Sequence, residues 1–166
     1  MTGEGLDDVA ALLRRRHGLR FDSAGRRRLA RGIEETARRA GTTPAALARR
    51  LGADAAAEHD LLDRVTLQEP SWFRDPATWA ALRETVLPAA LARDPELEIW
   101  SAGCAHGQEA WSLAMLLDEL GAPRARIVAS DVSGGAVARA VAGRYAEREL
   151  RGLDPERRAR HGSRSA

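Results

Sequence analysis

The 166-residue chain has no lysine and no asparagine, so all 26 of its basic residues are arginine. It has one cysteine, Cys104, which excludes an intramolecular disulfide framework and fits a reducing compartment. No apolar run is long enough to span a bilayer. The N-terminus is polar and acidic, without the basic and apolar regions of a secretory signal. We therefore expect a cytoplasmic protein with no membrane insertion.

Aromatic residues are scarce, at 4% of the chain, and the formal net charge is only +2. Residues 1–64 carry 13 arginines against 10 acidic residues, whereas residues 65–143 carry 6 against 10. Because a nucleic-acid interface usually combines a basic face with aromatic residues, this composition argues against nucleic acid as a partner. No spacing of His, Cys or carboxylates is typical of a metal centre, so no metal is expected.

The first part of the chain predicts a small all-helical N-terminal domain, residues 1–66. Leu29, Ile33 and Ala37 form an apolar stripe at helical spacing. Thr43-Pro44 is typical of a helix start, with threonine as the N-cap and proline at the first helical position. Arginines crowd residues 26–39. This basic helix could face an acidic partner helix or could be a solvated face, and the sequence leaves both interpretations open.

From about residue 67 helices alternate with strands, which predicts an α/β domain over residues 67–150. Asp75-Pro76 is expected to begin a helix that continues through Trp79 and Val86. Beyond it we predict a parallel pair of strands and two further helices: strands 97–101 and 126–130, and helices 107–120 and 134–142. Two strands are too few for a complete doubly wound sheet. The α/β domain is therefore expected to be partial.

Two features of this region are less sharply determined. The inward side of helix 107–120 could be formed by Trp111, Met115 and Leu116, or by Ala114 and Leu117. Residues 151–166 are polar and rich in arginine and lack an apolar period. They predict a disordered or frayed tail.

A glycine-punctuated turn follows the first predicted strand. Gly103 and Gly107 have the spacing G-x-x-x-G, and Glu109 lies in the first turn of the next helix. Glycine permits a sharp turn and close approach of a ligand, and a helix N-terminus offers unpaired N–H groups. Asp131, just past the second strand, could accept the hydroxyl protons of a ribose. The pattern indicates a nucleotide-like ligand at the carboxyl ends of the strands.

Each of these residues also has a structural interpretation. Glycines in turns are mostly structural, Glu109 could be an acid favoured by the helix dipole, and Asp131 could simply begin a turn. His106 is a single histidine in a loop, and Cys104 lacks the partner that a nucleophile needs.

Four ordered motifs resemble the CheR-type chemoreceptor glutamate methyltransferases. The family segment I-W-S-A-G-C-S-T-G-E-E-P-Y-S is similar to Ile99–Ser112, and the signature T-x-N-x-T-x-F-F-R is similar to Thr66–Arg74. Here Gln68 and Pro70 replace two hydrogen-bonding residues of that signature. The family's acid after the second strand matches Asp131, and its A-x-x-G-x-Y ending matches Ala140–Tyr145. The predicted helical domain, residues 1–66, also resembles the family's N-terminal domain.

The resemblance implies a Rossmann-like, S-adenosylmethionine-dependent methyltransferase domain. The family transfers a methyl group from S-adenosylmethionine to glutamates on the cytoplasmic helices of chemoreceptors. By position, the resemblance implies that Arg74 reaches the donor carboxylate or the reacting region and is the catalytic residue. It implies that the donor is bound by Thr66, Arg74, Ala102, Gly103, Gly107, Glu109 and Asp131.

Family members continue well beyond the position of Tyr145, with further strands that are not visible in this sequence. We therefore expect a truncated, weakly active protein-glutamate methyltransferase. The alternative is a non-catalytic remnant of the family that docks to receptors or binds a ligand.

Overall fold

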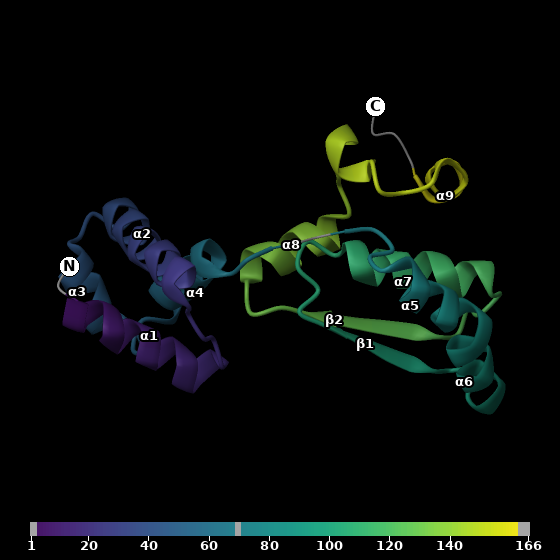
Figure 1. The fold of residues 1–166 in the computed structure, drawn as a ribbon, viewed down its shortest axis with the longest axis horizontal. Coiled ribbons are helices and arrows are strands. Elements are labelled where there is room, and N and C mark those ends of the chain that lie inside the picture. The colour runs from purple at the N-terminus through teal and green to yellow at the C-terminus, as the bar shows by residue number, and fades with distance from the viewer. Residues whose placement is uncertain (1–2, 69–70, 163–166) are drawn as a thin grey trace. The chain divides into compact units, whose positions relative to one another are not determined.

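The computed structural model describes residues 3–68 and 71–162. The chain divides into two compact units. The helical unit consists of residues 1–67 with 132–134, and the α/β unit consists of residues 68–131 with 135–166. The helices of the first unit are purple to blue in Figure 1, and the strands are teal and green. Each unit is described by itself.

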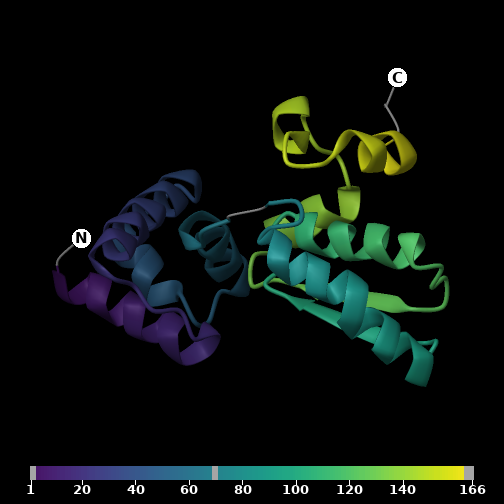
Figure 2. The same ribbon diagram turned by 45° about the vertical axis from the view of Figure 1, so that its right-hand side comes forward.

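The helical unit contains α1 (Gly3–His17), α2 (Ser23–Arg39), α3 (Pro44–Arg50) and α4 (Ala55–Val65) (Figures 1 and 2). The helices begin where the sequence offers N-caps. The side chain of Thr43 accepts a hydrogen bond from the Ala46 N–H at 3.2 Å, as Thr43-Pro44 predicted. Asp54 does the same for Ala57 at 3.0 Å, and Asp22 for Gly25 at 2.6 Å. Local sequence therefore sets where these helices start.

The core of the helical unit is one continuous apolar cluster. The predicted stripe of Leu29, Ile33 and Ala37 lies in it, at or below 1% exposure. Helix α2 approaches α4 closely at Gly32, where an added Cβ would lie 2.6 Å from a methyl group of Val65. The other buried members are Val9, Leu13, Leu47, Leu51, Leu61, Leu62 and Val65.

One carboxylate is buried beside this core. Glu58 is 3% exposed and accepts hydrogen bonds from His17 Nε2 at 2.5 Å and from the Gly52 N–H at 3.0 Å. It also pairs with Arg16 Nε at 2.9 Å. Burial raises the pKa of Glu58, but the His17 hydrogen bond and the charges of Arg16 and His17 outweigh it and hold the pKa below its ordinary value.

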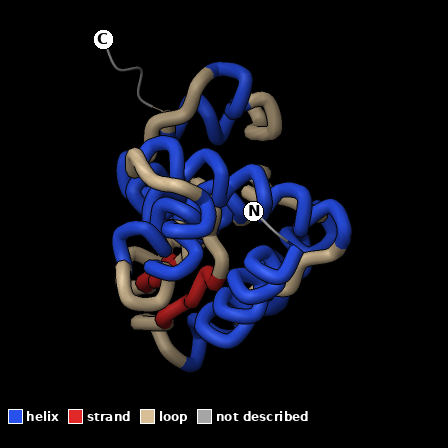
Figure 3. Tube along the Cα trace, turned by 90° about the vertical axis from the view of Figure 1, so that its left-hand side faces the viewer, coloured by secondary structure: helices blue, strands red, loops and turns tan. Residues whose placement is uncertain are grey.

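The α/β unit places its strands side by side and parallel, as predicted. Strands β1 (Glu98–Ala102) and β2 (Arg126–Ser130) pair in register from Glu98 opposite Arg126 to Ala102 opposite Ser130. Among the described residues the sheet has these two strands only, and helices make up most of the rest (Figure 3). The remaining elements are α5 (Pro76–Ala81), η1 (Leu82–Val86), α6 (Leu87–Arg93), α7 (Gln108–Glu119), α8 (Gly134–Ala142), η2 (Glu147–Leu150) and α9 (Pro155–His161).

The helix that starts at Pro76 continues to Arg93, but through one wider turn. Residues 82–86 form a π-helix, in which the Leu87 N–H donates to the carbonyl of Leu82. Pro88 follows directly. Proline has no N–H and its ring crowds the carbonyl four residues earlier, so a regular α-turn is unfavourable here. A π-turn is one way for a helix to pass such a residue.

One face of the sheet is packed and the other is open. Leu87, Leu116 and Leu117 form a cluster with Ile99 and Ile127 of the strands. On the opposite face Trp100 is 70% exposed and its register partner Val128 is 46% exposed. Successive side chains of a strand point to opposite faces of the sheet. Ile99 and Ile127 therefore lie on the packed face, and the next residues, Trp100 and Val128, lie on the open one.

Two predictions for this unit need correction. Trp111 does not face inward but is 41% exposed, and its indole Nε1 donates to the Ala140 carbonyl at 3.0 Å. Met115, Leu116 and Leu117 are buried, because α7 packs on two sides, against separate apolar clusters. Each of the two alternative predictions for the inward side of α7 is therefore correct in part.

Residues 151–162 are not frayed as expected. Helix α9 is capped by Asp154, whose side chain accepts from the N–H groups of Glu156 and Arg157 at 3.0 Å each. Leu153 is buried with Trp72 and Met115. The sequence has no apolar period here, and for that reason we expected disorder. The segment is held instead by the buried Leu153 and by ion pairs of Arg157 and Arg158.

Candidate functional site

The turn between β1 and α7 is tied to the end of β2. The N–H groups of Gly103 and Cys104 both donate to the carbonyl of Ser130, at 2.8 and 2.9 Å. The Gly107 N–H closes the turn on the Cys104 carbonyl at 2.8 Å. These bonds place residues 103–107 at the carboxyl ends of both parallel strands, where ligands bind in open α/β sheets.

The two glycines of this turn have different surroundings. Both have left-handed backbone, with φ of +75° at Gly103 and +93° at Gly107. A Cβ on Gly103 would meet nothing within 4 Å, whereas one on Gly107 would lie 2.7 Å from the Cβ of Ala140 and 3.1 Å from Tyr145 Oη. Gly103 therefore leaves space beside the backbone, and Gly107 allows α8 and Tyr145 to pack against the turn.

Two carboxylates lie at this turn. Glu109, exposed in the first turn of α7, accepts a hydrogen bond from Ser101 Oγ at 2.6 Å. Asp131, directly after β2, accepts one from the Ala105 N–H at 2.9 Å. Ala102, the last residue of β1, is exposed next to Gly103. The structure thus brings Ala102, Gly103, Glu109 and Asp131 to one edge of the sheet.

The pKa values of the other two titratable side chains of the turn shift in the direction of their neutral forms. Burial, and then the charge of Asp131, raise the pKa of the Cys104 thiol. Burial and the Arg139 charge lower the pKa of His106, although Glu149 and Asp131 act in the opposite direction. A protonated thiol is a poor nucleophile, so Cys104 does not resemble a catalytic cysteine.

Tyr145 holds this turn from the side, which sequence reasoning did not foresee. Its Oη donates to the His106 carbonyl at 2.6 Å, and burial raises its pKa to about 12. The only earlier signal for Tyr145 was its place in the family motif. Ser101 was also missed as the partner of Glu109, because its role depends on the strand placing it within reach.

Arg74 sits in a strained turn that is attached to α7. The residues on either side of it, Phe73 and Asp75, have φ of +46° and +60°. The Phe73 N–H donates to Ser112 Oγ at 3.2 Å. Asp75 is the N-cap residue of α5, but its backbone is left-handed and its side chain caps no backbone N–H; its carboxylate accepts instead from Thr78 Oγ1 at 2.6 Å. Arg74 itself is exposed.

Thr66 belongs to the helical unit. It ends α4, where its Oγ1 donates to the Leu62 carbonyl at 2.9 Å. Pro70 and its neighbour Glu69, both within the compared signature, lie outside the described residues.

Gly103, Glu109 and Asp131 do not line either of two hollows in the described part of the α/β unit. One of about 240 Å³ is lined by Ser71, Trp72, Gln108, Arg148, Glu149 and Gly152. Another, of about 360 Å³, includes Phe73, Trp79, Arg83 and Arg157. Ala102, Gly103 and Glu109 are exposed, so the candidate site lies at the surface of this unit. No described helix is long and apolar enough to cross a membrane.

Residues 68–166 match the model of the CheR methyltransferase SAM-binding domain. This chain belongs to the CheR methyltransferase family. The match covers the whole α/β unit and also residues 132–134, which belong to the helical unit. It indicates S-adenosylmethionine as the ligand of the domain.

Several bacterial proteins named as methyltransferases are similar to this chain. Chemotaxis protein methyltransferase 1 of Pseudomonas aeruginosa is 40% identical over 111 residues, which cover 61% of this chain and 40% of that protein. The chemotaxis protein methyltransferase of Listeria monocytogenes is 34% identical, covering 63% and 41%. The putative methyltransferase Cher3 of Pseudomonas putida is 34% identical, covering 74% and 45%. The matched part is thus less than half of each relative.

Proposed function

We propose that this chain binds S-adenosylmethionine at the turn after β1 and serves methyl transfer to glutamate side chains of chemoreceptors. The observation that carries the proposal is the open space beside Gly103, in a turn where the Glu109 carboxylate bonds Ser101 and the Asp131 carboxylate bonds the Ala105 N–H. The relatives are named for chemotaxis methylation. A receptor substrate places the proposed activity in the cytoplasm.

Each residue of the turn would contact a different part of the donor. Glu109 would pair with the donor's amino group, and Asp131 would accept the ribose hydroxyl protons. The space at Gly103 and the backbone of Ala102 would let the ligand lie against the end of β1. Arg74 would reach the donor carboxylate or the reacting methyl. Thr66 and Gly107 complete the proposed set, Gly107 through packing of the turn.

The reaction itself needs little from acid or base catalysis. A glutamate carboxylate is ionised at pH 7 and can attack the methyl group of the sulfonium directly. The new O–CH₃ bond forms as the C–S bond breaks, and the electron pair stays on sulfur as a neutral thioether. Enzymatic help then consists of position and orientation.

The helical unit offers a basic face for the receptor. Arg27 and Arg31 of α2 are exposed, whereas Arg26 pairs with Asp7 and Arg28 donates to the Val65 carbonyl. Charge complementarity of this kind mainly raises the encounter rate. Arg27→Glu with Arg31→Glu should weaken capture by an acidic receptor helix and leave donor binding unchanged. A pull-down insensitive to both substitutions would support the solvated-face interpretation.

Calorimetry with S-adenosylhomocysteine tests the donor site. Asp131→Ala should weaken binding by about 1–3 kcal/mol, because the ribose hydroxyls lose their acceptor. Asp118→Ala, an exposed acid on α7, is the matched control and should bind like the parent chain. Equal affinities for both variants would place the ligand elsewhere.

Transfer of labelled methyl to receptor glutamates tests the enzyme activity separately. Donor binding without transfer, together with receptor capture, would favour the non-catalytic alternative.

A further inference from the structure

We propose that Arg157 of α9 is a positioning residue for Arg74, which it holds in place through the ring of Phe73. The inference rests on the proposed donor site, because it gives Arg74 a ligand to reach. Its physical basis is independent of that site and lies in the contacts around the turn at residues 73–75.

The turn at residues 73–75 has to be held by its surroundings. Left-handed backbone is unfavourable for residues with a Cβ, and Phe73 and Asp75 both adopt it. Such conformations persist only where neighbouring contacts enforce them, and they occur preferentially at functional sites. Arg74 lies between the two, so the position of its backbone depends in part on what fixes Phe73.

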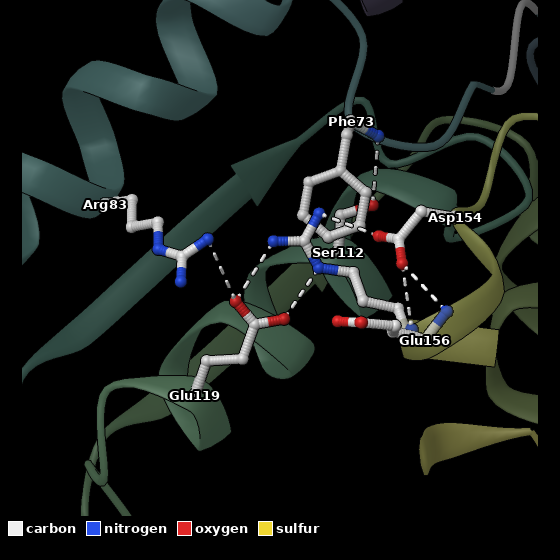
Figure 4. Close-up of polar contacts among 7 residues, drawn as sticks. Phe73, Arg83, Ser112, Glu119, Asp154 and Glu156 are labelled. Atoms are coloured by element: carbon white, nitrogen blue, oxygen red, sulfur yellow. Dashed lines mark hydrogen bonds and ion pairs between the residues drawn. The ribbon is translucent and has the colours of Figure 1, made fainter. Parts of the chain in front are cut away.

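Phe73 is fixed from three directions. Its N–H donates to Ser112 Oγ at 3.2 Å, and Trp79 meets its ring edge to face, with centroids 4.9 Å apart. The third contact is the guanidinium of Arg157, which lies 3.9 Å from the ring centroid. Figure 4 shows Phe73 and Ser112 together with Glu119, the acid that anchors this guanidinium.

Arg157 is itself held rigidly. Its Nε and Nη2 donate to the two oxygens of Glu119 at 2.6 and 3.0 Å, a bidentate pair, and Asp154 lies 3.4 Å from Nη1. Arg83 approaches the same Glu119 at 3.8 Å (Figure 4). The hydrogen bond from Arg157 lowers the pKa of Glu119, although burial acts against it, so the carboxylate stays charged. A planar guanidinium can bond a carboxylate and stack on a ring at once, which lysine cannot do.

Arg157, which follows β2 in the sequence, thereby contacts Phe73, which precedes α5. The clamp of Glu119, Arg157 and Phe73 joins α7, α9 and the turn within the α/β unit. Removing the guanidinium should release one face of the Phe73 ring and so loosen the hydrogen bond from the Phe73 N–H to Ser112. The backbone from which Arg74 would reach the donor would then be held less firmly.

The test compares Arg157→Met with Arg158→Met. Arg158 lies on the same helix and pairs with Glu147, so its loss matches the loss of charge without touching Phe73. We expect Arg157→Met to weaken S-adenosylhomocysteine by about fivefold, on the scale of one cation–π contact and one coupling between sites, and Arg158→Met to change nothing. Glu119→Gln should act in the same direction with a smaller effect.

A double-mutant comparison separates positioning from general loss of structure. If Arg157 acts through Arg74, its substitution should have no further effect in an Arg74→Ala background. An undiminished effect of Arg157→Met in that background, or no effect in the parent chain, would overturn the proposal.

Amide hydrogen exchange without ligand supplies a second readout. The Phe73 N–H should exchange faster in Arg157→Met and in Glu119→Gln than in Arg158→Met. Unchanged exchange would contradict the inference even if the donor binds, whereas a parent chain that binds no donor would contradict the proposed function instead. Failure of the two ideas can thus be told apart.

Discussion

The two units of this protein are stabilised by different kinds of contact. The helical unit has one continuous core whose large side chains, such as Leu13, Leu29 and Leu61, are fully buried. The α/β unit has two smaller clusters, around Trp72 and around Leu116, and leaves Trp100 and Val128 exposed on the sheet. Apolar burial accounts for the first unit, while much of the second depends on hydrogen bonds and ion pairs around α7.

The difference shows which substitutions each unit should tolerate. A tightly filled core loses stability whenever a large side chain is shortened, since packing leaves little room to relax. A unit held by polar contacts depends instead on individual donors, acceptors and backbone conformations. The sequence provides a convenient probe of this contrast, because all four tryptophans, at positions 72, 79, 100 and 111, belong to the α/β unit. Tryptophan fluorescence reports that unit, and far-UV circular dichroism reports both.

The largest effect is expected in the helical core. Leu29→Ala should lower the free energy of unfolding of the helical unit by about 2–5 kcal/mol, because it leaves a cavity in a fully buried site. Urea unfolding followed by circular dichroism should show the shift, and the fluorescence transition should stay in place. The exposed Leu67 provides the control, since Leu67→Ala should be nearly neutral. An equal shift of both signals would show that the units unfold together.

Gly107→Ala should give the largest loss within the α/β unit, about 2–4 kcal/mol by fluorescence-detected unfolding. The added Cβ meets Ala140 on left-handed backbone, so overpacking and backbone strain combine. Gly103→Ala should cost only the backbone part, about 1–2 kcal/mol, because open space surrounds the new methyl group. It should nevertheless weaken S-adenosylhomocysteine. Equal stability losses would mean that the two glycines are equivalent.

Acid should weaken both units through buried carboxylates. The pKa values of Glu58 and Glu119 in the folded chain lie below the ordinary value of 4.5. Their stabilising contribution is therefore complete above about pH 4.5 and is lost as the pH falls through the lowered pKa of each. Glu58→Gln should reduce the acid dependence of the circular dichroism transition, and Glu119→Gln that of the fluorescence transition.

At neutral pH each of these substitutions should cost about 1–3 kcal/mol, the scale of a hydrogen bond to a charged group. We expect the larger loss at Glu58, which is 3% exposed against 11% for Glu119. Acid profiles identical to those of the parent chain would exclude these carboxylates as the source of the pH dependence.

The smallest effect is expected on the open sheet face. Trp100→Ser should change the free energy of unfolding by no more than about 0.5 kcal/mol, as is usual for an exposed side chain. The remaining tryptophans still report the fluorescence transition. A loss above about 1 kcal/mol would indicate that this face is packed in solution, and the contrast between the units would then be smaller than the structure suggests.

Much of the local structure could be predicted from the sequence. Thr43-Pro44 begins a helix, residues 126–130 form a strand, and the two strands pair in parallel. These features depend on neighbouring residues and on the period of apolar positions, which a sequence displays directly. The candidate site could be located for the same reason, because a glycine turn after a strand and an acid after the next strand meet at one edge of a parallel sheet.

Other features depended on contacts between distant residues. The exposure of Trp111 follows from its hydrogen bond to Ala140, and the order of α9 follows from the pairing of Arg157 with Glu119. The different surroundings of Gly103 and Gly107 arise because α8 and Tyr145 lie against one glycine and not the other. The residues next to them in the sequence do not allow these partners to be predicted.

The sequence by itself thus determined most of the helices, the parallel strands, the family and the edge of the sheet where a ligand is expected. Capping, side-chain periodicity and backbone conformation act over a few residues, so they can be read in order along the chain. Only the tertiary structure decided which glycine leaves open space and which arginine holds the turn around Arg74. Those outcomes depend on side chains that are far apart in sequence, such as Phe73 and Arg157, and become neighbours only in the folded chain.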